Sequence, residues 1–185
     1  MRNLLFLLTF TFQPAIADDI CHDLWFTRNA IMDRAGYCFG STLGQAVFDN
    51  SDCTGKTVNL TRQTIDFVNR IKSQEAGFGC RVDTGQTVLD LDDLHIRRRL
   101  ADLPLRDEFE SACIGWLGPE TPLYAGHDLG SGQVGRIMPG DNISFAFWPE
   151  GDWAYLTILA PDWSVKSGGW SNVGFPDSSC RDLAG

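Results

Sequence analysis

The chain has 185 residues, of which 24 are acidic and 15 are Lys or Arg, so its formal net charge at pH 7 is −9. Affinity for nucleic-acid phosphates comes from Lys and Arg side chains that displace counterions, so this charge excludes nucleic acid as an expected partner. The one basic run, Arg97 to Arg99, has acidic neighbours on both sides and is expected to be a solvated face.

The first 17 residues have the three parts of a secretory signal peptide. Arg2 precedes an apolar stretch from Leu4 to Phe12, and Ala15 and Ala17 form the small-residue pattern of a cleavage site. This stretch is too short for a membrane-spanning helix, which needs about 20 apolar residues. We therefore expect cleavage after Ala17 and a periplasmic or secreted protein that does not span the membrane.

All six cysteines follow this leader, and an even number in an oxidising compartment indicates three disulfides. Zinc is the alternative, but the cysteines and the three histidines are too scattered for a zinc site. We therefore expect no metal and no cofactor. Many pairings are possible, and of these we expect Cys38 with Cys53, Cys21 with Cys80, and Cys113 with Cys180.

From Asp23 to Glu75 apolar residues recur at helical spacing, which predicts a small helical domain over residues 18–80. The first predicted helix ends at Gly36, Ser41 and Thr61 are expected to cap the next two, and the last ends at Gly77. The residues expected to face inward are Leu24, Ile31 and Ala35 in the first helix, Leu43, Ala46 and Val47 in the second, and Ile65, Val68 and Ile71 in the third.

The rest of the chain divides into two further segments. Residues 81–110 are charged and contain Pro104, and we interpret them as a connector that packs on one or both neighbours. Their adjacent carboxylates, such as Asp92 and Asp93, are expected to be solvated. In residues 111–185, Gly, Pro, Asp and Asn separate short aromatic and branched runs, as in a small barrel or sandwich. The predicted fold class is α+β.

A motif in the run LWFTRNAIMDRAGYCF includes Trp25, Arg28, Asn29, Arg34, Gly36 and Tyr37, with Leu24, Ile31, Phe39 and Phe48 around them. It resembles the YARHG domain, a small helical module of secreted and envelope-associated bacterial proteins, over residues 21–77. Only Arg34 and Gly36 remain of the five letters that name the family, so this is a divergent branch. The resemblance implies no known catalytic activity.

Three polar residues of this motif, Arg28, Asn29 and Arg34, have two possible roles. They could form a polar recognition face, or they could satisfy backbone carbonyls within the module. We favour the structural role, because a buried donor without a partner costs about 1–3 kcal/mol.

A second set of positions lies in residues 111–185: Leu123, Tyr124, Gly135, Pro139, Gly140, Trp153, Leu156, Gly169 and Trp170. Their order resembles that of a bacterial SH3 domain, which implies that the small helical domain is followed by an SH3-like β-barrel. Members of that family often bind cell-wall peptide or glycan, or protein partners. Fold alone does not fix function, so the ligand is carried over only by analogy.

Four aromatic residues are candidates for ligand binding: Trp148, Trp153, Tyr155 and Trp163. Strand alternation puts some of them on the outer face of the sheet or in a groove, where flat aromatic surfaces suit peptides or sugars. The alternative is that they fill the barrel core.

No pattern in the sequence predicts catalysis. Gly130, Gly132 and Gly135 match the dinucleotide fingerprint, but Pro139 follows too soon for the helix that this motif requires. No nucleophile–base pair is recognisable. We therefore expect a non-catalytic binding or structural module of the envelope, with cell-wall peptide or glycan or an envelope protein as its partner. The alternative is a peptidoglycan-active hydrolase, or an inhibitor of an envelope hydrolase.

Overall fold

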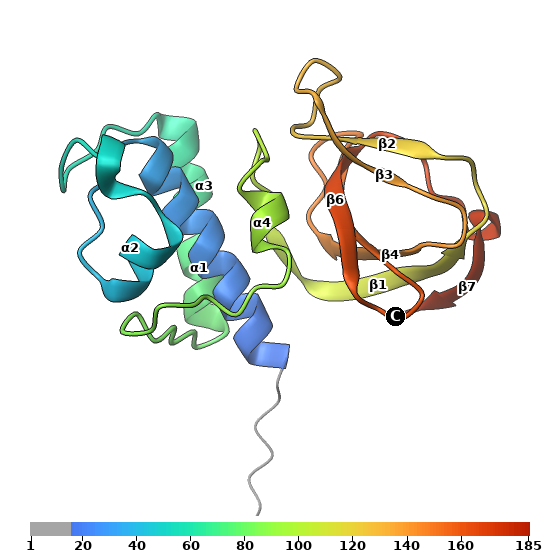
Figure 1. Cartoon of the computed structure of the whole chain (residues 1–185), viewed down its shortest axis with the longest axis horizontal. Helices are drawn as coiled ribbons and strands as arrows, with labels where there is room; N and C mark the ends of the chain where they lie inside the picture. The colour runs from blue at the N-terminus through green and yellow to red at the C-terminus, as the bar shows by residue number, and fades with distance from the viewer. Residues whose placement is uncertain (1–15) are drawn as a thin grey trace, which may run out of the picture.

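A computed structural model describes residues 16–185, so the expected leader, apart from Ile16 and Ala17, lies outside the described residues. The chain forms a group of helices followed by a β-sheet, which confirms the α+β class (Figure 1). None of the helices within residues 16–185 is long and apolar enough to cross a membrane. The helices are α1 (Ile16–Arg34), α2 (Thr42–Val47), α3 (Arg62–Gly77) and α4 (Leu94–Arg97), with 3-10 turns η1 (Asn50–Asp52) and η2 (Asp177–Ser179).

Local sequence signals set the helix ends as predicted. The Ser41 hydroxyl accepts the N–H of Gly44 at the start of α2, and the Thr61 hydroxyl accepts the N–H of Thr64 at the start of α3. After α1 the backbone turns at Gly36, whose φ of +84° lies in the left-handed region.

Two of the residues expected to face inward are exposed instead, Ala46 and Ile65. In the short helix α2, Leu43 and Val47 are buried as expected, and they lie on one face of the helix. In α3 the buried residues start one turn later than expected, because Leu60 and Phe67 pack at that end of the cluster. The helical spacing of apolar residues alone did not identify which turns of each helix pack against other parts of the chain.

The strands form one antiparallel sheet in the order β3-β2-β6-β5-β4-β1-β7, which curls round strongly in Figure 1. The outer edge of β1 is occupied by β7, which leaves β3 and β7 as two separate edges. The expectation of a closed SH3-like barrel is therefore wrong. The strands are β1 (Arg106–Trp116), β2 (Thr121–Tyr124), β3 (Gln133–Ile137), β4 (Asn142–Phe147), β5 (Ala154–Leu159), β6 (Val165–Ser171) and β7 (Cys180–Ala184).

Three disulfides brace the two parts, and they join the same pairs that we expected. Cys21–Cys80 ties α1 to the end of α3, Cys38–Cys53 closes the loop around α2, and Cys113–Cys180 joins β1 to β7. The last bond spans 67 residues, and closing a loop of that length contributes about 4 kcal/mol in the chain-entropy model.

Residues 81–110 pack on both neighbours. Leu89 is buried in the cluster between α1 and α2, and Leu105 in the cluster between α1 and α3. Leu100, three residues after α4, is buried against the sheet beside Tyr155. The segment also contains the first residues of β1, so it is an integral part of the packing of both halves.

Gly36 gives the first testable prediction. A Cβ at Gly36 would lie 2.6 Å from the Thr54 Oγ1 and would also strain a backbone with φ of +84°. Gly79 has φ of +67° with nothing within 4 Å of such a Cβ, so it carries the backbone strain alone. We expect Gly79→Ala to lose about 1–2 kcal/mol of unfolding free energy and Gly36→Ala to lose more, as measured by urea unfolding. Equal losses would show that the contact with Thr54 is unimportant.

Candidate functional site

Strand β5 presents its two faces to different surroundings. Leu156 points into the hydrophobic cluster on one face of the sheet, and Tyr155, Thr157 and Leu159 alternate to the other face. There Tyr155 is covered by Leu100 and forms part of a second core. Thr157 and Leu159 instead line an open cleft of about 300 Å³.

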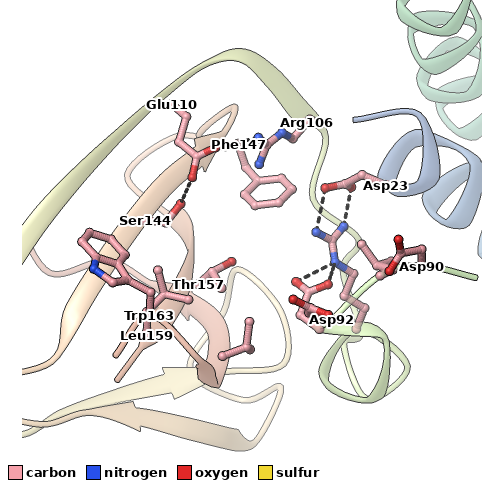
Figure 2. Close-up of a pocket in the computed structure, with 14 residues that line it drawn as sticks. Asp23, Asp90, Asp92, Arg106, Glu110, Ser144, Phe147, Thr157, Leu159 and Trp163 are labelled. Carbon is pink, nitrogen blue, oxygen red and sulfur yellow. Dashed lines mark hydrogen bonds and ion pairs between the residues drawn. The ribbon is translucent and has the colours of Figure 1, made fainter. Parts of the chain in front are cut away.

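We call this recess the acidic cleft; Figure 2 shows it from close by. Ser144 of β4 lines it together with Thr157 and Leu159, and Trp163 lies on the side opposite Asp90 and Asp92. The residues that line its walls are Asp90, Leu91, Asp92 and Asp93 before α4, Arg106 and Glu110 of β1, Trp163 and Val165 around the β5–β6 turn, and Asp23, Arg97 and Phe147 at the junction with the helices.

A buried ion network lies at this junction. The Arg97 side chain is only 2% exposed. Its Nε donates to both carboxylate oxygens of Asp93 at 2.8 Å, and its Nη2 donates to Asp23 Oδ2 at 2.8 Å. The guanidinium carbon lies 4.9 Å from the ring centroid of Phe147 and 5.9 Å from that of Tyr155. Arg97 therefore links α1, α4 and the sheet.

Burial and the paired charges act in opposite directions within this network. Burial raises the pKa of the Asp23 carboxyl, the neighbouring charge of Asp93 raises it further, and Arg97 opposes both. Burial alone would lower the pKa of Arg97, but the carboxylates of Asp23 and Asp93 outweigh it, so the guanidinium stays charged. Burial also raises the pKa of Tyr155. Asp23 and Arg97 bind each other directly, whereas the buried hydroxyl of Tyr155 has no hydrogen-bond partner among the described residues.

The wall formed by β1 is tied to the floor of the acidic cleft. Ser144 Oγ donates to Glu110 Oε1 at 2.8 Å, and Arg106 Nη2 donates to Glu110 Oε2 at 2.8 Å. On the opposite wall, Asp90 and Asp92 are exposed and form no hydrogen bond or ion pair with any residue of the described chain. The mouth of the cleft thus carries two free carboxylates.

The four predicted aromatic residues do not form one surface. Trp163 is 52% exposed at the acidic cleft, and Trp148 is 46% exposed in a separate hollow beside α3. Trp153 is half-buried, with its ring 5.9 Å from that of Tyr124. Tyr155 is only 1% exposed, so it is a core residue and not a surface for ligands. The outer face of β5 is covered at Tyr155 by the segment after α4, a cover that strand alternation does not reveal.

The polar residues of the YARHG motif make internal contacts. Arg28 Nε donates to both carboxylate oxygens of Glu75 on α3 at 3.0 Å, and Asn29 Nδ2 donates to the carbonyl of Trp25 at 2.7 Å. Arg34 donates to the carbonyls of Leu100 and Ala101 at 2.6 and 2.7 Å. Only Asn29 donates to a backbone carbonyl within the module, since Arg28 pairs with a side chain and the carbonyls bound by Arg34 lie outside residues 21–77, so the structural role stays a prediction.

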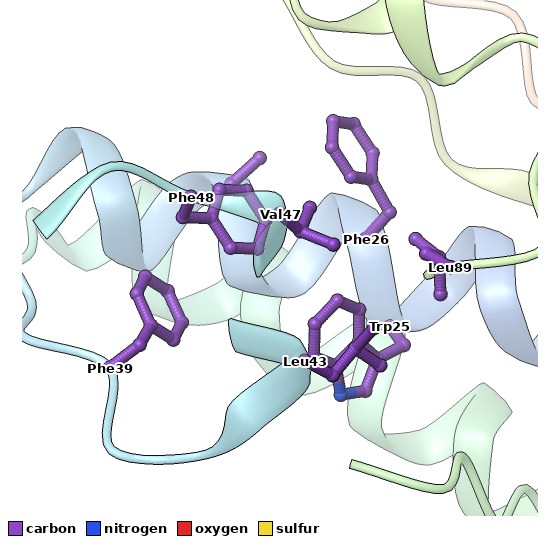
Figure 3. Packing of buried hydrophobic residues seen from close by; sticks show 8 residues of the cluster. Trp25, Phe26, Phe39, Leu43, Val47, Phe48 and Leu89 are labelled. Carbon is purple, nitrogen blue, oxygen red and sulfur yellow. The ribbon is translucent and has the colours of Figure 1, made fainter. Parts of the chain in front are cut away.

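The aromatic residues of the motif lie beneath α1 and around α2 (Figure 3). Trp25 is 6% exposed, and its ring centroid lies 6.0 Å from that of Phe48. Phe39 stacks on Phe48 at 4.8 Å, while Tyr37 meets the edge of Phe39 at 5.1 Å. Together these rings fill the space between α1 and the loop around α2.

Two expectations for charged residues were wrong. Arg97 is buried, although Arg98 and Arg99 of the same run are exposed. Asp93 is 5% exposed, whereas adjacent Asp92 is solvated as expected. The spacing of Asp93 and Arg97, which is i to i+4, was a usable signal for an ion pair on a helix. Nothing local indicated that Asp23, 74 residues away, would complete the network.

The glycine motif is not followed by a helix, and the described residues contain no metal-binding group. The glycine motif that starts at Gly130 leads into strand β3, where the dinucleotide fingerprint requires a helix. Among residues 16–185, no three His, Cys, Asp or Glu side chains are grouped so as to hold a metal ion.

Comparison with known proteins gives two family matches. Residues 79–185 match the family described as a domain of unknown function (DUF4453), and residues 2–76 match the YARHG domain. The second match confirms the resemblance seen in the sequence, and neither match bears on the resemblance to bacterial SH3 domains. No curated protein and no solved structure matches the chain. Apart from Asp23, every residue that lines the acidic cleft lies in the first match.

The ion network gives the second prediction. Arg97→Met would leave two buried carboxylates without a counter-charge, so we expect a loss of about 3–5 kcal/mol of unfolding free energy at pH 7. In the folded variant these carboxyls would hold protons to higher pH than in the unfolded chain, where their pKa is about 4. The stability of the variant should therefore rise as the pH falls from 7 towards about 4, and part of the loss should be recovered.

Urea unfolding at pH 7 and pH 5 measures both effects. Arg99→Met, which removes an exposed guanidinium from the same segment, is the matched control and should change stability little at either pH. A loss for Arg97→Met that matches the control, or that grows on acidification, would contradict the assigned role of the network.

Proposed function

Because the chain belongs to the DUF4453 family, whose description assigns no activity, we propose its function from the site: an exported, non-catalytic, envelope-associated module that binds its ligand in the acidic cleft. The proposed ligand is cell-wall peptide or glycan, or an envelope protein. The observation that carries this proposal is the open recess of about 300 Å³ with Trp163 exposed at its rim, a size at the lower end of the range for ligand pockets.

Export is supported by the sulfur chemistry. Three disulfides account for all six cysteines and are consistent with an extracytoplasmic protein. The apolar leader in residues 1–17 and its Ala-x-Ala site support a secretory route. Residues 2–76 match the YARHG domain. The resemblance to this domain implies a protein of the cell envelope, which also supports export.

The geometry of Trp163 supports a binding role for the acidic cleft. Its backbone has φ of +68°, the only positive value at a residue other than glycine within the described chain. A left-handed backbone costs a residue with a side chain about 1–2 kcal/mol, and such strain is concentrated at functional sites. We infer that Trp163 is retained for contact with a ligand, since the turn itself would favour glycine.

Within the acidic cleft, the one carboxyl with a raised pKa is poorly placed for catalysis. A general acid or base needs a shifted carboxyl within reach of a substrate proton. The carboxyl of Asp23 is buried, and both of its oxygens already accept hydrogen bonds from Arg97. Proton transfer there would require the ion network to open.

One observation favours the second candidate function, a peptidoglycan-active hydrolase. His127 Nδ1 lies 3.1 Å from Asp102 Oδ2 in a separate recess of about 300 Å³ between the helices and the sheet. A carboxylate-oriented imidazole is the arrangement of a general base. Thr64 also lines that recess, but its hydroxyl hydrogen-bonds with the hydroxyl of Thr61.

Zymography on peptidoglycan separates the two functions. We expect no cleared zone from the purified wild-type protein, because binding alone does not break the wall. A cleared zone that disappears in His127→Ala would support the hydrolase and overturn the non-catalytic proposal.

Photo-crosslinking in the native bacterium tests the proposed function. A photoreactive phenylalanine analogue is introduced in place of Leu159, inside the acidic cleft, or in place of Trp148, outside it. We expect an adduct with an envelope component from position 159 and none from position 148. We also expect Trp163→Gly to abolish the adduct while its unfolding free energy stays within about 1 kcal/mol of the wild type, because glycine relieves the backbone strain. No adduct from position 159, or the same adduct from both positions, would contradict the proposal.

A further inference from the structure

We infer that the ligand of the acidic cleft is a basic polypeptide segment, of which one Lys or Arg side chain enters the recess. This inference rests on the proposed function and narrows it, because it selects a protein partner over the cell wall. The contacts, charges and size of the recess carry it.

The charges of the lining residues favour a cation. Five carboxylates and two guanidinium groups line the acidic cleft, which leaves a formal charge of −3. Both guanidinium groups form ion pairs within the chain: Arg97 is held by two carboxylates, and Arg106 is held through its Nη2 by Glu110, while its Nε has no partner among the described residues. Asp90 and Asp92 are the two carboxylates that make no ion pair with the described residues. An incoming cation would therefore meet attraction at the mouth without displacing an internal partner.

The surfaces between these carboxylates and Trp163 fit the rest of a long basic side chain. Figure 2 shows Thr157 and Leu159 between Trp163 on one side and Asp92 on the other. Lys and Arg bury an aliphatic stem along apolar surface while the charged end stays near water or an anion. The indole face of Trp163 can also attract the cation directly. The aspartates thus suit the charged end of such a side chain, and Leu159 and the indole of Trp163 offer apolar surface for its stem.

The same charges disfavour a cell-wall stem peptide. Such a peptide carries free carboxylates beside its amine, and these would face the carboxylates of the acidic cleft and the net negative charge of the chain. Like-charge contacts oppose binding. A basic protein segment brings the cation without that repulsion.

Isothermal titration calorimetry at low salt tests the inference with three probes: a blocked peptide of alternating Lys and Ala, the same peptide with acetylated lysines, and a soluble muropeptide. We expect the full-length protein to bind the lysine peptide and neither of the other two. Asp90→Asn/Asp92→Asn should bind the lysine peptide about 2- to 30-fold more weakly, as expected for the loss of two exposed ion pairs. Added salt should weaken the wild type more than this variant.

The matched control is Asp66→Asn/Asp182→Asn, which makes the same change in charge at two exposed positions outside the acidic cleft and should bind within two-fold of the wild type. Equal weakening in both double variants, or equal binding of the acetylated peptide, would overturn the inference. If no lysine peptide binds while the adduct from position 159 persists, the inference fails and the proposed function stands. If the adduct is also absent, both fail.

Discussion

One buried guanidinium group connects the two halves of this protein. Arg97 binds a carboxylate of α1 and another at the start of α4, and its flat face lies against rings of β4 and β5. A buried ion pair seldom adds more stability than apolar residues of the same size would, because both charges lose their water. What it adds is geometric restriction, since the fork of donors accepts carboxylates only in its own plane. We therefore expect Arg97 to set where the helices sit on the sheet.

The position of α4 then decides what the outer face of the sheet can do. The short helix and Leu100 after it cover Tyr155 and Trp170 and convert that half of the face into a core. The other half remains open and becomes the floor of the acidic cleft, with the residues before α4 as one wall. Adjacent residues of the same segment therefore have different surroundings: Asp93 belongs to the buried ion network, while Asp92 faces solvent at the acidic cleft.

Features that depend on a few neighbouring residues could be predicted from the sequence. Ser41 and Thr61 cap their helices and Gly36 turns the backbone, because each effect acts within four residues. Features that depend on distant partners could not. The edge of β1 is occupied by β7 from the end of the chain, so the expected barrel does not close. Asp23 and Arg97 are 74 residues apart and meet only through the tertiary fold, and a basic run in an acidic segment gave no sign of this contact.

The chain as a whole is negatively charged, and so is the lining of the acidic cleft. A formal charge of −9 already argued against polyanionic partners, but composition could not say where the charge gathers. In the folded chain the basic side chains that line the recess form ion pairs within the protein. Arg97 pairs with two carboxylates, and Arg106 pairs with Glu110. Internal pairing of the cations leaves the carboxylates of Asp90 and Asp92 without an ion pair among the described residues, and our inference of a basic ligand rests on these two groups. We therefore expect a partner that contacts this surface to carry positive charge.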